Sequence, residues 1–194
     1  MKRGKKELII EAAESLFIEK GYVETKVEDI AKKIGISKGN FYTYFKSKDD
    51  VLYEIIEMNK IKTGERIGEI DVNRSPSEIL EEFFIFKIKR FLKHIHTINL
   101  KTIGELLENE KINRAREEIK NMELEFLEEN VLKKYDKQDK AIIKFIHSSV
   151  EAFIFNESCD GELEEKETYI ERRREAVKKV IKFLDNGLKQ QEEK

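Results

Sequence analysis

The chain has 194 residues but only one cysteine, one proline and no tryptophan. The single cysteine, Cys159, excludes an internal disulfide bond and a cysteine-rich zinc site, which suits a reducing compartment. One proline and nine glycines are too few for the many turns of an all-β sandwich. No apolar run approaches the roughly 18 residues that a membrane span needs, and Glu7, Glu11 and Glu14 interrupt the segment where a secretory signal would be apolar. We therefore expect a cytoplasmic protein with no membrane partner.

Charged residues of both signs are abundant. They make up 40% of the chain, beside 39% hydrophobic residues, and the twelve phenylalanines need a core, which excludes disorder throughout. The formal net charge is -2, but residues 1–50 hold eleven Lys/Arg against nine Asp/Glu, so the first quarter is slightly positive. This distribution excludes a histone-like coating of DNA and permits a local phosphate-binding surface near the N-terminus.

Apolar residues recur every three to four positions along almost the whole chain, which predicts an all-α fold. We expect helices at about 5–20, 25–34, 37–45, 47 into the sixties, 76–95, 97–108, 111–134, 138–157 and 163–186. Three of their starts carry capping residues. Thr25 and Glu28 have the spacing of a capping box, Ser47 precedes the long fourth helix, and Ser75 precedes Pro76 at a first helical position.

The stretch 27–44 has the pattern of a helix-turn-helix. Two helices that cross steeply need a small residue at their contact, which Ala31 provides. The tight turn between them needs a left-handed residue, which Gly35 provides, and Ile36 then fills the turn. In such a unit the second helix enters the major groove of DNA.

A run of motif residues in this region extends the pattern: Gly21-Tyr22, Thr25, Ile30-Ala31, Gly35 to Gly39, Phe41-Tyr42, Tyr44-Phe45 and Lys46 to Lys48. With these residues the chain resembles the N-terminal domain of TetR/AcrR-family transcriptional regulators over about residues 8–55. Two departures are Lys26, where a second threonine is frequent, and Asn40-Phe41, where many members have Thr-Leu or Ser-Leu. The departures bear on base preference rather than on the fold.

The resemblance implies a double-stranded operator as the partner and a set of DNA-binding residues: Thr25, Ser37, Lys38, Gly39, Asn40, Tyr42, Thr43, Tyr44 and Lys48. Side chains on the second helix would meet base edges, whereas Thr25, Tyr42 and Lys48 would bind phosphates. The alternative for Tyr42 and Tyr44 is packing within the small domain, as we expect for Phe41 and Phe45. We favour a phosphate contact for Tyr42, because its hydroxyl needs a polar partner.

Other candidate sites have simpler interpretations. The basic residues before position 7 form either a DNA-contacting arm or an ordinary solvated terminus. His94, His96 and His147 lack the spacing of a metal motif, so we expect packed or surface histidines and no metal. No phosphate-binding loop, nucleophile motif or Cys/His pair is present, so we expect neither an enzyme nor a cofactor.

The remainder of the chain is too apolar to serve only as a dimer clip. The resemblance implies a small-molecule pocket in it, with candidates Phe84, Phe91, Ile103, Leu107, Met122 and Phe126; the alternative is a filled core. The last two long helices have apolar faces that one chain covers only in part, which predicts a homodimer through Phe153, Val177 and Leu184.

These observations predict two domains, a three-helix DNA-binding domain at 1–48 and a larger helical ligand-binding and dimerisation domain at 49–194. The predicted function is a repressor that a small, largely apolar ligand releases from its operator. The alternatives are a DNA-binding regulator without an effector and a helical protein-interaction module.

Overall fold

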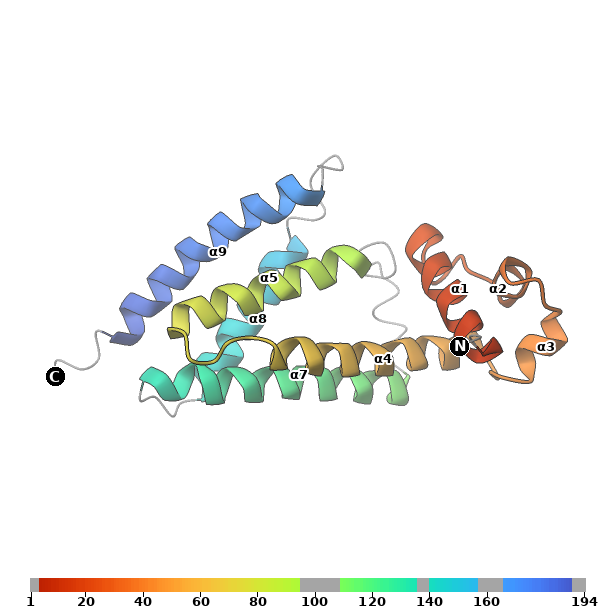
Figure 1. Ribbon diagram of the computed structural model, residues 1–194, viewed down its shortest axis with the longest axis horizontal. Coiled ribbons are helices and arrows are strands. Elements are labelled where there is room, and N and C mark those ends of the chain that lie inside the picture. The colour runs from red at the N-terminus through yellow and green to blue at the C-terminus, as the bar shows by residue number, and fades with distance from the viewer. Residues whose placement is uncertain (1–3, 95–108, 136–139, 157–165, 190–194) are drawn as a thin grey trace. The chain divides into compact units, whose positions relative to one another are not determined.

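The computed structural model describes residues 4–94, 109–135, 140–156 and 166–189, and every regular element in these ranges is helical (Figure 1). The helices are α1 Lys5–Lys20, α2 Val27–Lys33, α3 Lys38–Tyr42, α4 Lys48–Gly68, α5 Pro76–His94, α7 Glu110–Asn130, the 3-10 helix η1 Leu132–Tyr135, α8 Lys140–Asn156 and α9 Lys166–Lys189. The predicted all-α class is confirmed. The helix expected at 97–108 lies outside the described residues, and none of the described helices is long and apolar enough to cross a membrane.

Two of the three predicted helix starts are confirmed. At α4, the Ser47 hydroxyl accepts a hydrogen bond from the Asp50 amide. At α5, Ser75 and Glu78 form a reciprocal capping box ahead of Pro76. The third prediction is wrong by one residue, because α2 begins after Lys26, whose amide donates to the Asp29 carboxylate at 3.0 Å.

The chain divides into two compact units, and α4 and α7 contribute to both. Unit 1 contains Met1–Thr63 and Lys93–Ile119; unit 2 contains Gly64–Leu92 and Lys120–Lys194. The core of unit 1 combines apolar side chains of α1 to α4 with Ile112 of α7. The division of function after residue 48 remains a prediction.

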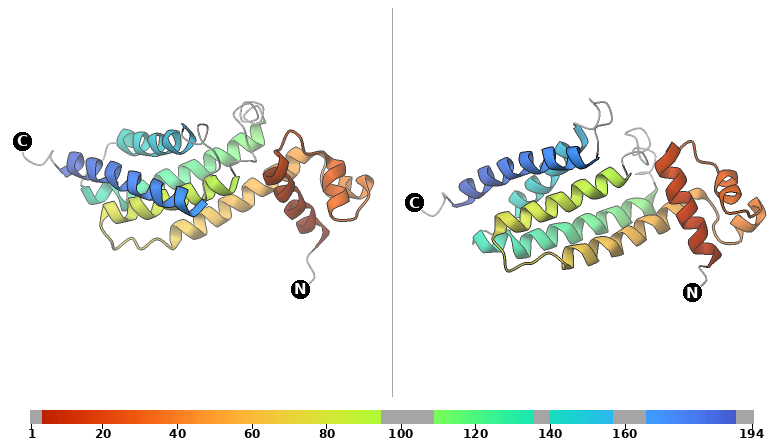
Figure 2. Two further views of the ribbon diagram at one scale, coloured as in Figure 1. Left: turned by 90° about the horizontal axis from the view of Figure 1, so that it is seen from above. Right: turned by 45° about the horizontal axis from the view of Figure 1, so that its top comes forward.

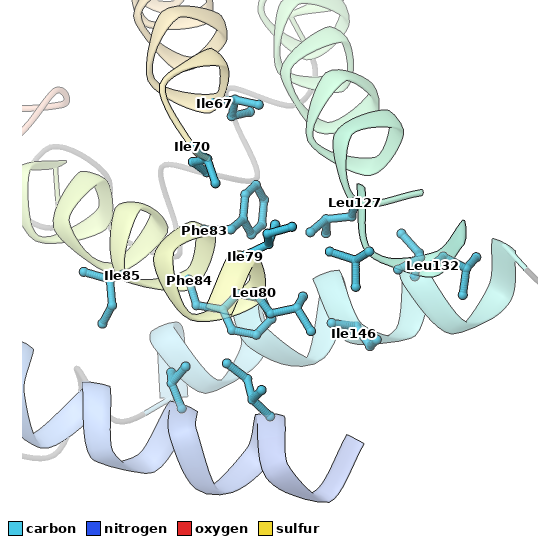
Figure 3. Close-up of a cluster of buried hydrophobic side chains, with 14 of the residues drawn as sticks. Ile67, Ile70, Ile79, Leu80, Phe83, Phe84, Ile85, Leu127, Leu132 and Ile146 are labelled. Carbon is cyan, nitrogen blue, oxygen red and sulfur yellow. The ribbon is translucent and has the colours of Figure 1, made fainter. Parts of the chain in front are cut away.

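Unit 2 is a helical bundle in which α5 lies among α7, α8 and α9 (Figure 2). The apolar stripe of α5 supplies most of the interior, and its members are Ile79, Leu80, Phe83, Phe84 and Ile88. In Figure 3, Phe83, Leu80 and Phe84 point toward Leu127 of α7 and Ile146 of α8. The second candidate site described below adjoins this packing, since Lys87 Nζ lies 5.9 Å from the centroid of the Phe83 ring.

Candidate nucleic-acid interface

The turn between α2 and α3 follows the predicted helix-turn-helix closely. Gly35 has φ +69°, and its amide donates to the Lys32 carbonyl while the Ile36 amide donates to the Ala31 carbonyl. These two bonds form a Schellman motif, which satisfies the last carbonyls of α2 and requires a left-handed residue at Gly35. Ala31 is buried where the helices meet. The sequence therefore specifies this turn through one glycine and one small residue.

Helix α3 is short and anchored from one side. Ser37 caps it, since its hydroxyl accepts from the Asn40 amide at 3.1 Å. Phe41 and Phe45 are buried with their ring centroids 6.0 Å apart, as expected for packing residues. The helix ends at Tyr42 rather than at residue 45, because the chain continues in a turn in which the Tyr44 amide donates to the Phe41 carbonyl.

The opposite side of α3 is turned to solvent. Tyr42 is 47% exposed and Tyr44 41% exposed, although both are large aromatic residues. Lys38, Gly39 and Thr43 are exposed beside them. Five of the predicted DNA-contacting residues therefore share an accessible surface; we call this set the α3 face, and its contact with DNA remains a prediction.

Asn40 differs from its neighbours on α3. Its Oδ1 atom is buried and has no hydrogen-bond partner among the described residues. Its backbone carbonyl accepts a hydrogen bond from the Thr43 hydroxyl at 2.6 Å. For Asn40 to read a base as predicted, its side-chain amide must first turn outward.

Lys38 has an internal counter-charge that the sequence analysis did not include. Its ammonium group lies 2.5 Å from Glu28 Oε1 and 5.9 Å from the centroid of the Tyr42 ring. The hydrogen bond with Lys38 lowers the pKa of Glu28, and the same bond raises the pKa of Lys38. Because both side chains are about half exposed, a DNA phosphate can compete for this ammonium group.

Lys48 is not free to bind a phosphate directly. Its ammonium group donates to the carbonyls of Tyr22, Val23 and Thr25 at 2.9, 3.1 and 3.2 Å and lies 4.3 Å from the centroid of the Tyr22 ring. The Tyr22 hydroxyl donates in turn to Asp49. We call this arrangement the Lys48 clamp. It ties the start of α4 to the turn between α1 and α2, using all three ammonium hydrogens.

The expectation that Thr25 binds a phosphate is corrected. The side chain is fully buried, and its hydroxyl donates to the Gly21 carbonyl at 2.7 Å. The Thr25 amide donates to the Tyr22 carbonyl. Thr25 therefore fixes the α1–α2 turn from inside, where no phosphate reaches it.

A second candidate site lies in unit 2, where charged side chains of three helices meet. Lys87 of α5 is 2.8 Å from Glu123 Oε2 of α7, 2.9 Å from His147 Nε2 of α8 and 3.0 Å from Glu151 Oε1 of α8. Arg90 of α5 lies 2.7 Å from the other Glu123 oxygen. We call these five residues the Lys87 cluster.

Burial and contacts act in opposite directions on the pKa of Glu123 in the Lys87 cluster. Burial by itself raises the pKa of Glu123, but the hydrogen bond from His147 and the charges of Arg90 and Lys87 outweigh it and lower the pKa to about 2. Glu123, His147 and Glu151 are also metal-ligand types with donor atoms within 4.8 Å of one another. However, the ammonium group of Lys87 already lies among these atoms, in the place of a cation. His147 is buried, as expected.

The pocket candidates have different environments. Phe84 is fully buried, and Phe126 is partly buried and stacks on Phe83 with ring centroids 5.9 Å apart. Phe91 is partly buried against the same core, and Met122 is half-buried near Gly64. Ile103 and Leu107 lie outside the described residues.

The dimer candidates need a correction. Val177 is buried in the core of its own chain, and Leu184 is partly buried against it; the side chain of Phe153 lies outside the described residues. Among the described side chains of these helices, large apolar groups stay open at Phe145, which is 70% exposed on α8, and at Val180 and Phe183, which are 44% and 78% exposed on α9. The predicted helices thus have uncovered apolar residues, at positions other than those predicted.

Comparison with known proteins shows which protein family the chain resembles. Residues 9–55 match the family model of bacterial regulatory proteins, tetR family. The uncharacterized HTH-type transcriptional regulator YerO of Bacillus subtilis is 30% identical over 185 residues, covering 87% of this chain and 63% of YerO. The chain spans less than two thirds of YerO and 47% of a second B. subtilis regulator that it matches.

Solved structures extend the match over nearly the full chain. A TetR/AcrR-family transcriptional regulator from Aquifex aeolicus VF5 is 30% identical, with a TM-score of 0.67 over 93% of this chain and 99% of the other. FadR from B. subtilis, solved with stearoyl-CoA, is 19% identical with a TM-score of 0.66 over 90% and 96% and shares the fold. The relatives are described as transcriptional regulators, which agrees with the expectation of a non-enzymatic protein. The chain belongs to the TetR/AcrR family of transcriptional regulators.

Proposed function

We propose that the protein is a homodimeric repressor that binds a double-stranded operator through α3 and releases it when a small, largely apolar effector binds in unit 2. The observation that carries the DNA-binding part is the α3 face. Two tyrosines, one at the end of α3 and one in the turn that follows it, remain more than 40% exposed, although Phe41 packs the opposite side of the helix into the core. Exposed phenol groups at the edge of a helix-turn-helix are suited to phosphate contacts.

The test of DNA binding removes a single hydroxyl group. Tyr42→Phe deletes the proposed phosphate contact and leaves the ring, and we expect operator affinity to fall about fivefold, which corresponds to about 1 kcal/mol. Tyr53→Phe makes the same deletion on α4, where the ring is half-buried, and serves as the control. Fluorescence anisotropy with a selected operator measures both. Equal affinities for the two variants would contradict a role for the α3 face.

Uncovered apolar side chains on α8 and α9 support the dimer. Phe145 and Phe183 are each at least 70% exposed, and Val180 is 44% exposed. Burying them against a second copy removes apolar area from water, and a two-fold axis lets the same helices serve both chains. A dimer also presents two recognition helices, which must lie one helical turn of DNA apart, about 34–36 Å, or a multiple of it.

The effector part of the proposal depends on unit 2. Its interior holds the stacked Phe83 and Phe126 with Phe84 beside them, and aromatic side chains of this kind favour contact with an apolar molecule. The same fold in FadR accommodates stearoyl-CoA. Helix α4 runs unbroken from Lys48 to Gly68 and provides the lever through which the effector acts on DNA binding.

A screen of apolar compounds, read by release of operator DNA, tests this part. Release by such a compound supports the repressor, whereas release by metal ions or small anions alone would overturn the pocket. If no compound releases DNA, the regulator without an effector becomes the better interpretation. If the wild-type protein binds no DNA sequence specifically, the protein-interaction module becomes the better interpretation.

A further inference from the structure

The Lys87 cluster combines buried side chains with one partly exposed side chain that another group can replace. Lys87, Glu123 and His147 are each at most 4% exposed, so their mutual contacts are held by the surrounding helices. The side chain of Glu151, by contrast, is 45% exposed and reaches Lys87 from the solvent side. The third contact of a buried ammonium group is therefore made by a carboxylate that can move away into water.

Glu151 fits its place incompletely. One oxygen lies 3.0 Å from Lys87 Nζ, but the other is 3.8 Å from His147 Nδ1, beyond hydrogen-bond distance. His147 Nε2 lies 2.7 Å from Glu123 Oε2, an ionised acceptor, so Nε2 carries a hydrogen and donates it, and its 2.9 Å approach to Lys87 Nζ is not a hydrogen bond. The other ring nitrogen, Nδ1, faces Glu151. Nδ1 is buried and has no hydrogen-bond partner among the described residues. An unsatisfied buried nitrogen is costly, so a better-placed partner is favoured.

The surroundings of the site are aromatic. Lys87 Nζ lies 5.9 Å from the centroid of the Phe83 ring. Phe83 stacks on Phe126 and contacts Phe84 edge-on. The ammonium group thus stands at the border between the charged cluster and the apolar interior of unit 2. A molecule that binds here needs one anionic end and an apolar body.

We infer that Lys87 and His147 bind the carboxylate of an effector whose remainder is apolar, and that this carboxylate replaces Glu151. This inference rests on the proposed function and names the effector class. One ligand oxygen takes the place of Glu151 as the acceptor for Lys87 Nζ. The other accepts a hydrogen bond from His147 Nδ1–H, and the imidazole, whose Nε2–H already donates to Glu123, takes up one proton from solvent as the ligand binds. Glu123 stays ionised between Arg90 and Lys87, and the ligand carboxylate supplies the second negative charge in place of Glu151.

The test compares an acid with its uncharged analogue. Decanoate and decanamide have the same apolar body, and calorimetry measures the binding of each to the full chain. We expect the wild-type protein to bind decanoate at least tenfold more tightly than decanamide. Equal binding of the two compounds would overturn the inference.

Substitution of Glu151 should increase the affinity for the ligand, whereas most substitutions in a binding site reduce it. Glu151→Gln removes the competing carboxylate from a half-exposed position, so the variant folds and should bind decanoate several-fold more tightly. Glu129→Gln, an exposed substitution on α7, should leave the affinity unchanged. Lys87→Met should abolish the preference for the acid, with circular dichroism confirming the fold. Weaker binding of decanoate by Glu151→Gln would overturn the inference.

Two further results separate the site from the switch. Tight, acid-selective binding without release of operator DNA supports the site and contradicts the proposed repressor mechanism. Release of DNA by decanamide alone supports the repressor and overturns the carboxylate site. Stabilisation of the wild-type protein by ZnCl2 or MnCl2, lost in Glu151→Gln, would instead make the cluster a metal site and would also overturn the inference.

Discussion

Replacing Lys48 by methionine distinguishes a clamp from a phosphate contact. Methionine keeps most of the side-chain length and removes the ammonium group that holds the Tyr22, Val23 and Thr25 carbonyls. Hydrogen bonds to a charged group contribute about 1.5–3 kcal/mol each, but these three share one partly exposed ammonium that water can replace in part. We therefore expect a total loss of about 2 kcal/mol, which lowers Tm by roughly 4–8 °C in a chain of this size.

The salt dependence of DNA binding gives the decisive comparison. Each phosphate contact contributes a slope of about 0.9 to the plot of log affinity against log salt. Lys48→Met should weaken operator binding by the same factor at every salt concentration, because the ammonium group is occupied by carbonyls. Lys38→Met, on the exposed α3 face, should reduce the slope by about 0.9. If Lys48→Met reduces the slope as much as Lys38→Met and leaves Tm unchanged, the clamp is refuted.

Three further predictions concern other parts of the chain. Glu28→Gln should strengthen DNA binding several-fold at low salt, because it frees Lys38 and removes a negative charge; weaker binding in an anisotropy assay would contradict this. Phe183→Glu should give a monomer of unchanged helix content by light scattering and circular dichroism, whereas the exposed neighbour Lys182→Glu should remain dimeric. The pKa of Glu123 is lowered from 4.5 to about 2, so its ionisation stabilises the fold above pH 5 by about 3 kcal/mol, and this stability is lost as the pH falls toward 2. Denaturant unfolding across this range should show a loss that is larger in the wild-type protein than in Glu123→Gln, because the other carboxylates with lowered pKa values, such as Glu28 and Glu118, titrate in both proteins.

Local features of the DNA-binding segment were predictable from the sequence. Ala31 and Gly35 specify the turn between two adjacent helices, and the turn is built from residues that are close together in the sequence. The cap of α2 was misplaced because Thr25–Glu28 and Lys26–Asp29 both have the required three-residue spacing. The competing bond from the Thr25 hydroxyl to the Gly21 carbonyl decides between them.

Contacts across the chain were not predictable in the same way. Lys87 meets Glu123 and His147 at separations of 36 and 60 residues, and no periodic pattern indicates such pairings. Lys48 looked like a phosphate ligand because the carbonyls it holds are more than twenty residues away. On α9, periodicity identifies the apolar residues but does not show which of them pack against the other helices of the same chain. The sequence therefore did not distinguish Val177, which is buried, from Phe183, which is exposed.

The turn at Gly35 also offers a means of conditional control. A Cβ added at this position meets no atom within 4 Å, so Gly35→Ala carries no steric clash and alters no residue of the α3 face. Its cost comes only from the left-handed backbone, about 1–2 kcal/mol. A loss of that size leaves a marginally stable domain folded when cool and partly unfolded when warm. The substitution is therefore a route to a temperature-sensitive allele, in which a shift of growth temperature unfolds the helix-turn-helix while the residues of the α3 face stay unchanged.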